Sequence, residues 1–231
     1  NDGVPHFKLP SFKGAGVAIP VFSLRTKKSF GCGEFSDLKP FADLAKSMGL
    51  RIIQTLPIND TTSTHTWKDS YPYSAISTFA LHPMYISVEG CGEVPNKHDY
   101  EKMRNELNAS ETVDYEKVME WKMSILQSMF DRDKKEFLES HDFKTFYESN
   151  RHWLRPYAVF SYLRDKFGTC NTSQWGDYAN YTEGKMSALC DNQSVAYLKI
   201  TFYYYLQYHL DRQLKEAVAY CHSLGIALKG D

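Results

Sequence analysis

The sequence lacks any marked excess of charge of one sign. Its 231 residues hold 27 Lys and Arg against 28 Asp and Glu, which gives a formal net charge of −1. Such a chain has no basic field to attract the phosphates of nucleic acid or the surface of an anionic membrane. We therefore expect neither nucleic acid nor membrane as a partner.

Several sequence motifs are also missing. The five cysteines are scattered and form no Cys-x-x-Cys pair, which argues against a zinc cluster or a redox motif. No HExxH, GxSxG or Walker motif occurs, so three common classes of catalytic site are not indicated. We find no signal peptide and no apolar run long enough to span a bilayer. These absences predict a cytoplasmic protein with reduced thiols, in which the five Asn-x-Ser/Thr sequons are coincidental.

The first part of the chain alternates strand, helix and strand signals. The apolar run 16–24 predicts a buried strand, with Pro20 near its end because proline cannot donate to a sheet. Residues 36–48 predict a helix capped by Ser36 or Asp37 and ended by Gly49. The mostly apolar run 51–58 predicts a second strand, covered on both faces. This order indicates a βαβ unit, and hence an α/β fold with parallel strands.

The next strand signal comes only at 225–231, after a long predicted helix at 194–224 with an apolar stripe that begins at Val195 and Leu198. The intervening segment is mostly helical in character. It predicts one helix at 111–140 and another at 155–167, where Pro156 would occupy the first turn. Residues 168–193 are polar and broken. We therefore expect a large helical insertion between the second and third strands.

The segment that follows the second predicted strand combines aromatic and hydroxyl side chains. It reads LPINDTTSTHTWKDSYPYSAISTFALHP (56–83) and carries Trp67, Tyr71, Tyr73 and Phe79 among Ser, Thr and Asp. Loops after parallel strands lie at the carboxyl edge of the sheet, where ligands bind. Aromatic faces beside hydroxyl groups suit a sugar ring, which has apolar faces and a polar rim. The alternative is a loop that only packs over the rim of the fold.

Five motifs, in the same order over about Gly14 to Asp231, resemble the amylomaltases, the 4-α-glucanotransferases of glycoside hydrolase family 77. Within that family they are most similar to the cytosolic plant-type disproportionating enzymes. The resemblance implies strands 1–3 of a (β/α)8 barrel, with 1–95 and 194–231 forming part of the barrel and 96–193 a helical insertion subdomain. It implies no cofactor and no metal. The motifs are SFGCGEFSDL, LPIND, DSYPYSAISTFALHPMYI, WLRPYAVFSYLRDKFGT and YYLQYHLDRQLKEAVAYCHSLGIALKGD.

The resemblance also assigns site residues. It implies that Pro72, Tyr73 and Ser74 contact glucan, and that either Ser70 or Tyr71 does so beside them. Asp231 matches a family Gly-Asp beside the active site, although a strand-ending Asp is an equal reading. Neighbouring residues expected at the same rim are Asn59, Trp67 and Asp69.

The catalytic groups of the family are expected elsewhere. The Asp nucleophile and the Glu acid/base should lie beyond Asp231, so we expect these 231 residues to bind α-glucan without transferring it. The partner would be maltose, a maltooligosaccharide, or a glycogen- or starch-like polymer, and the oligomeric state stays open. Two alternatives are a catalytically inactive glucan-binding module and an interaction protein whose helices at 111–167 dock a partner. His82 is expected to be structural and Glu34 a loop residue that could face the site.

Overall fold

A computed structural model describes residues 13–231, so that most of the predicted irregular lead-in 1–15 lies outside the described residues. Within this range no helix is both long and apolar enough to cross a membrane. The strands are β1 (Gly16–Ile19), β2 (Ile52–Thr55) and β3 (Ala227–Lys229). The helices are α1 (Leu38–Ser47), α2 (Lys97–Ala109), α3 (Tyr115–Glu139), α4 (His141–Phe167), α5 (Glu183–Leu189) and α6 (Tyr197–Ser223).

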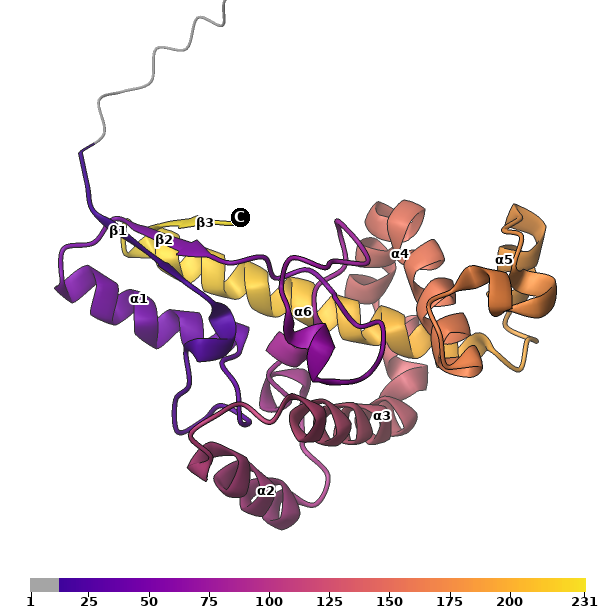
Figure 1. The fold of residues 1–231 in the computed structure, drawn as a ribbon, viewed down its shortest axis with the longest axis horizontal. Coiled ribbons are helices and arrows are strands. Elements are labelled where there is room, and N and C mark those ends of the chain that lie inside the picture. Colours follow the sequence, from indigo (N-terminus) through magenta and orange to yellow (C-terminus); the bar gives the residue numbers. More distant parts are fainter. Residues whose placement is uncertain (1–12) are drawn as a thin grey trace, which may run out of the picture.

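The three strands form one parallel sheet in the order β1-β2-β3, as the βαβ pattern predicted. Val17 pairs with Ile53, and Ile53 pairs with Leu228 on the other side. Helices α1 and α6 lie together along the sheet (Figure 1), and a small core of α1, α6 and strand side chains joins the two layers. Pro20 follows the last paired residue of β1, where the missing donor has no consequence.

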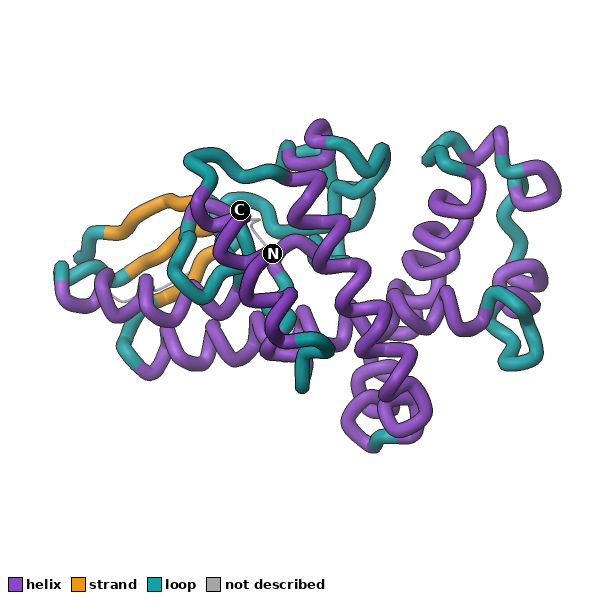
Figure 2. The backbone as a smooth tube through the Cα atoms, turned by 90° about the horizontal axis from the view of Figure 1, so that it is seen from below, coloured by secondary structure: helices purple, strands orange, loops and turns teal. Residues whose placement is uncertain are grey.

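The prediction that the second strand is covered on both faces was wrong. Ile53 and Thr55 are buried, whereas Ile52 and Gln54, which point the other way, are partly exposed. The reason is that α1 and α6 supply cover on one face of the sheet only. Seen from below, the strands lie at one end of the elongated molecule and helices make up most of the rest (Figure 2).

Helix α1 ends as predicted but begins differently. Gly49 adopts a left-handed conformation with φ of +75°, which stops the helix. Asp37 sits at the position before the helix, but its carboxylate makes no capping bond there. It instead accepts hydrogen bonds from Thr26, Ser29 and the Glu34 amide, and so holds the loop after β1 against the helix.

The helical part contains more helix than the sequence predicted. Helix α2 and the short α5 were not foreseen, and α4 begins at His141 instead of 155. Pro156 therefore lies inside α4, where an interior proline costs about 3 kcal/mol. Burial of Leu154, Tyr157 and Ala158 around it offsets that cost. The Ser140 hydroxyl caps the true start by accepting from the Phe143 amide.

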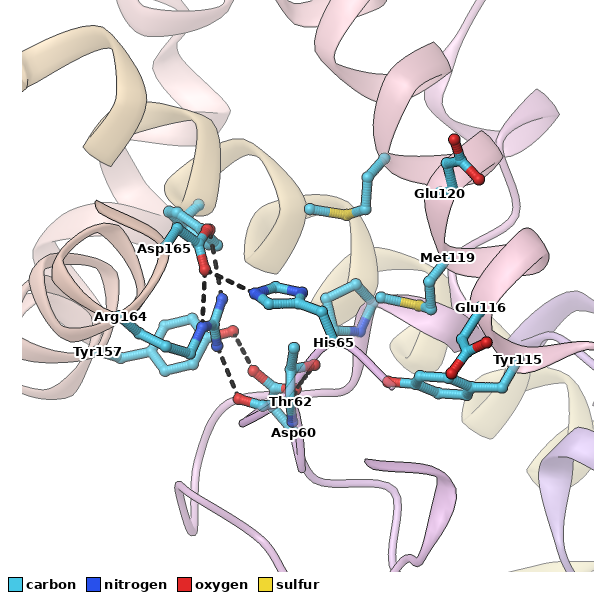
Figure 3. Close-up of a pocket in the computed structure, with 13 residues that line it drawn as sticks. Asp60, Thr62, His65, Tyr115, Glu116, Met119, Glu120, Tyr157, Arg164 and Asp165 are labelled. Atoms are coloured by element: carbon cyan, nitrogen blue, oxygen red, sulfur yellow. Dashed lines mark hydrogen bonds and ion pairs between the residues drawn. The ribbon is translucent and has the colours of Figure 1, made fainter. Parts of the chain in front are cut away.

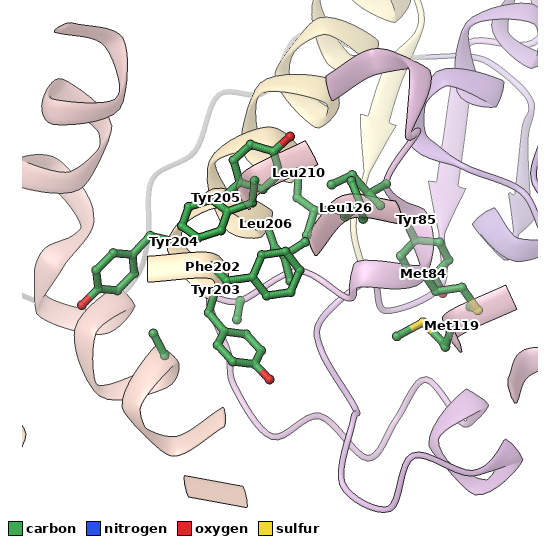
Figure 4. Packing of buried hydrophobic residues seen from close by; sticks show 14 of the residues in the cluster. Met84, Tyr85, Met119, Leu126, Phe202, Tyr203, Tyr204, Tyr205, Leu206 and Leu210 are labelled. Carbon is green, nitrogen blue, oxygen red and sulfur yellow. The ribbon is translucent and has the colours of Figure 1, made fainter. Parts of the chain in front are cut away.

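Helix α6 connects the helical part to the sheet. The predicted stripe was wrong at its beginning, because Val195 precedes the helix and is 98% exposed, and Leu198 is also exposed. From Ile200 to Leu210 the helix is instead buried nearly all round, since α3, α4 and the loop after β2 surround it. Figure 4 shows the aromatic run of α6 packing in this core beside Leu126.

Candidate functional site

The segment after β2 is a closed loop with a paired neck. Asn59 forms an antiparallel bridge with Leu81. The Asp60 amide donates to the Ala80 carbonyl at 2.8 Å, and the His82 amide donates to the Ile58 carbonyl at 3.0 Å. The side-chain amide of Asn59 also donates to Ala80, so Asn59 belongs to the neck of the loop.

Asp69 organises the interior of this loop. Its side chain is 3% exposed, and its carboxylate accepts hydrogen bonds from Ser63, from both the amide and hydroxyl of Thr64, and from the His65 amide. Burial raises the pKa of Asp69, but these donors outweigh it and the net pKa is lowered. The Asp69 oxygens thus bond within the loop, and a role for Asp69 beside bound sugar stays a prediction.

The loop displays its aromatic rings to the outside. Tyr71 is 59% exposed and Tyr73 is 55% exposed, and their ring centres lie 5.6 Å apart at 50°. Trp67 is also exposed, in the short 3-10 helix Trp67–Ser70. Phe79 stacks on Trp153 of α4 with 5.8 Å between ring centres. Large apolar rings at a surface are commonly binding features.

Tyr73 meets the residue that follows the third strand. Its hydroxyl donates to the Asp231 carboxylate at 3.2 Å, across 158 positions of sequence. Gln54 of β2 lies 3.5 Å from the other oxygen of Asp231. Burial and the hydrogen bond to Asp231 raise the pKa of Tyr73, so the phenol keeps its proton as a donor. Two residues predicted separately for one site are thus adjacent at the carboxyl edge of the sheet.

The other predicted contact residues lie on the same loop. The Ser70 hydroxyl donates back to the Trp67 carbonyl at 2.7 Å, which leaves its oxygen free to accept. Pro72 is half-buried between the two tyrosines, and Ser74 is exposed just after them. Tyr71 is nearer than Ser70 in the chain to the Tyr73–Asp231 contact, and both residues are exposed.

Helix α4 holds residues 60–65, the first leg of this loop, through side chains that the sequence analysis did not single out. The Tyr157 hydroxyl donates to the Asp60 carboxylate at 2.7 Å. Near the end of the helix, Arg164 donates to the Thr62 carbonyl at 2.8 Å. Figure 3 shows these side chains converging on the loop. Along α4 they meet Asp60 and Thr62 in chain order, so the helix and this part of the loop run side by side.

Asp165 joins three elements. His65 of the loop donates through Nε2 at 2.8 Å, Arg164 donates through Nε at 2.8 Å, and the Tyr203 hydroxyl of α6 donates to the second oxygen. Burial raises the pKa of Asp165, but the donors and the Arg164 charge lower it to about 2 overall. The carboxylate is therefore charged throughout the physiological range.

His65 has an unusual backbone. Its φ is +58°, a left-handed conformation that costs a non-glycine residue about 1–2 kcal/mol. Its amide donates to Asp69 at 2.7 Å and its ring donates to Asp165. On another side its ring borders a cavity of about 290 Å³ that Tyr115 and Met119 also line. The His65 ring is therefore held by its hydrogen bond to Asp165, with the cavity on its other side.

Two glutamines of α6 hold the returning part of the loop at Leu81 and the segment after the loop at Ser87. Gln207 accepts from the Leu81 amide and donates to the Leu81 carbonyl, both at 2.8 Å. Gln213 makes the same pair of bonds to Ser87, at 2.7 and 2.9 Å. Each buried side chain thus satisfies one backbone donor and one backbone acceptor of an otherwise irregular segment.

Glu34 does not face this site. It is buried and pairs with Lys122 of α3 at 2.7 Å. Burial raises the pKa of Glu34, and the Lys122 ammonium opposes that rise. His82 is structural, as expected: Nδ1 accepts from the Met84 amide and Nε2 bonds to the Tyr115 hydroxyl.

Metal chemistry finds no support in the described residues. Between 13 and 231, no group of three or more His, Cys, Asp or Glu side chains is placed to hold a metal ion. The five cysteines are free thiols.

Parallel strands with covering helices, and an exposed aromatic loop at their carboxyl edge, define an α/β protein. In open α/β folds ligands commonly bind beyond the carboxyl ends of the strands. The family model described as 4-alpha-glucanotransferase matches residues 19–231, and the chain belongs to that family. It is 42% identical over 223 residues to 4-alpha-glucanotransferase DPE2 of Oryza sativa, covering 95% of this chain and 24% of that protein.

Other relatives agree. The chain is 33% identical to the 4-alpha-glucanotransferase of Chlamydia muridarum, covering 94% of this chain and 40% of the relative. The chain thus spans about a quarter to two fifths of the length of these curated relatives. An amylomaltase from Streptococcus agalactiae, solved in complex with acarbose, superposes with a TM-score of 0.74 at 22% identity, covering 95% of this chain and 43% of that chain. This likeness shows a shared fold.

Proposed function

We propose that the chain supplies a glucan-binding face of a retaining 4-α-glucanotransferase. In this proposal the complete protein forms a (β/α)8 barrel in the cytoplasm, to which 1–95 and 194–231 contribute strands 1–3 and 96–193 an insertion subdomain. The substrates are maltose and a maltooligosaccharide or a glycogen- or starch-like polymer. The catalytic Asp and Glu lie beyond Asp231.

The observation that carries this proposal is the contact between Tyr73 and Asp231. It joins the exposed aromatic loop to the end of β3 at the edge where parallel sheets bind ligands. A sugar ring could stack on Tyr71 or Tyr73 while its hydroxyls reach the Asp231 carboxylate and the Ser70 and Ser74 hydroxyls. The Tyr73 hydroxyl, held by Asp231, would present its oxygen lone pairs to a sugar hydroxyl.

The test is maltose turnover and maltose binding by the full-length protein with Tyr73→Ala and Tyr73→Phe. Loss of both the ring and the hydroxyl should weaken transition-state binding by about 1–3 kcal/mol, and loss of the hydroxyl alone by less. Tyr181→Ala is the matched control, because Tyr181 is another exposed tyrosine whose hydroxyl also bonds a carboxylate, that of Glu183. Unchanged kcat/KM in Tyr73→Ala would refute the proposal.

A further inference from the structure

We propose that Asp165 is a positioning residue for the glucan-binding loop: by holding His65, it sets the direction in which the chain runs toward Tyr71 and Tyr73. The inference rests on the proposed function, because it concerns how the same loop is presented to sugar. Asp165 would not itself touch substrate.

The first support is where the hydrogen bonds of the loop go. Its first leg is tied to α4, through Tyr157 to Asp60 and Arg164 to Thr62. Among the described residues, segment 71–74 makes no hydrogen bond to α4 or α6; its bonds are to Lys68, to Tyr71 and to Asp231. The two tyrosines are therefore oriented by the Asp231 contact and by the chain that leads to them, in which the first leg ends at His65 and the Trp67 amide donates to Glu116 of α3.

The first leg ends at His65. The left-handed backbone there changes the course of the chain immediately before the short helix Trp67–Ser70 that leads to Tyr71. A non-glycine residue keeps such a conformation only where its surroundings enforce it. Two hydrogen bonds enforce this conformation at His65: its backbone amide donates to the Asp69 carboxylate, and its ring donates to the Asp165 carboxylate at 2.8 Å.

Packing alone does not hold the His65 side chain. It is half exposed, and the cavity of about 290 Å³ beside it gives the ring room to rotate. Asp165 is by contrast well fixed, since Arg164 and Tyr203 hold it from two helices. Figure 3 shows the His65 ring joined to the fixed Asp165 carboxylate, which thus restrains the ring.

The experiment compares Asp165→Asn and His65→Gly in the full-length protein. Asp165→Asn weakens the acceptor for His65. His65→Gly removes the ring but also removes the backbone strain, because glycine adopts positive φ freely. Both variants should raise the KM for maltose about tenfold with kcat within about twofold, as expected when only positioning for binding is lost. Amides 66–74 should also exchange with deuterium faster.

His65→Gly separates positioning from stability. A residue that merely stabilised the fold would lower the unfolding temperature and raise KM together. Here relief of strain should leave the unfolding temperature unchanged or higher while KM still rises. Asp133→Asn is the matched control, because Asp133 accepts from neighbouring Arg132 much as Asp165 accepts from Arg164, but it lies on α3 outside the loop network.

Each result decides the matter. Faster exchange of 66–74 with a raised KM in both variants, and neither change in Asp133→Asn, supports the proposal. Unchanged exchange of 66–74 in both variants overturns it, as does faster exchange throughout the molecule in His65→Gly, whose unfolding temperature should not fall. If the wild-type protein binds no maltose, the proposed function fails, and amide exchange alone still decides whether Asp165 orders the loop.

Discussion

Replacement of Lys122 by methionine should destabilise the protein severely. Lys122 is buried in α3, where its ammonium pairs with Glu34 at 2.7 Å and donates to the carbonyls of Met84 and Ile86 at 2.7 and 2.9 Å. Methionine nearly preserves the volume but removes the charge and every donor. Glu34 would then be a buried carboxylate without its cation, and two buried carbonyls would lose a partner.

The expected loss in the free energy of unfolding is about 3–5 kcal/mol, the usual cost of removing one partner from a buried ion pair. Each unsatisfied carbonyl would add at most about 1–3 kcal/mol, and these contributions are not additive. The loss should shrink as pH falls toward 4. Burial raises the pKa of Glu34, so acid protonates this carboxyl in the folded state before the unfolded one and removes the unpaired charge.

Urea unfolding of wild type, Lys122→Met, Glu34→Gln and the double variant measures this effect. The double variant should lose less free energy of unfolding than the two single variants together, because it removes both charges and leaves neither one unpaired. Lys117→Met is the control on the same helix: Lys117 is exposed and pairs only with Asp114 at the surface, so its loss should be within about 0.5 kcal/mol. A Lys122→Met protein as stable as this control would refute the reasoning.

Three further predictions use other parts of the molecule. In Asp165→Asn the loss in the free energy of unfolding should be constant above about pH 5 and diminish between about pH 4 and 2. The reason is that a carboxyl with a folded pKa of about 2 loses its contribution to stability as pH falls through that value. Acid unfolding curves of the variant and the wild type measure this loss. Ser140→Ala should cost about 1 kcal/mol in thermal unfolding by removing the cap of α4, whereas the exposed mid-helix Ser128→Ala should not. Residues 1–231 alone, incubated with maltose and glycogen, should release no glucose, since a retaining transfer needs both carboxyls; turnover near that of the full-length protein would show that those carboxyls are placed wrongly.

The parts of the fold that sequence predicted correctly have local causes. Gly49 and Gly225 end helices because each takes a positive φ, and such glycines can be recognised without knowing the fold. The meeting of Tyr73 with Asp231 was also within reach, since parallel topology alone brings the ends of β2 and β3 to one edge. Whether either residue contacts sugar stays a prediction.

The errors came where distant contacts outweighed local preference. Pro156 suggested a helix start, but α4 continues on both sides of it because the burial of its neighbours offsets the cost of an interior proline. The Asp165 contacts join segments 100 and 38 residues apart, and no spacing rule connects such residues before the fold is known.

The place of Gln207 has a consequence for the order of folding. It anchors Leu81 across 126 positions, and the Asp165 contacts also require Tyr203, so the loop after β2 cannot be secured until α6 has been synthesised. A chain leaving the ribosome would expose β1, β2 and the aromatic loop while well over a hundred further residues are made. Contacts this distant in sequence form slowly, and unpaired strands left waiting are prone to associate. Chaperone dependence during synthesis should therefore be greatest before α6 emerges.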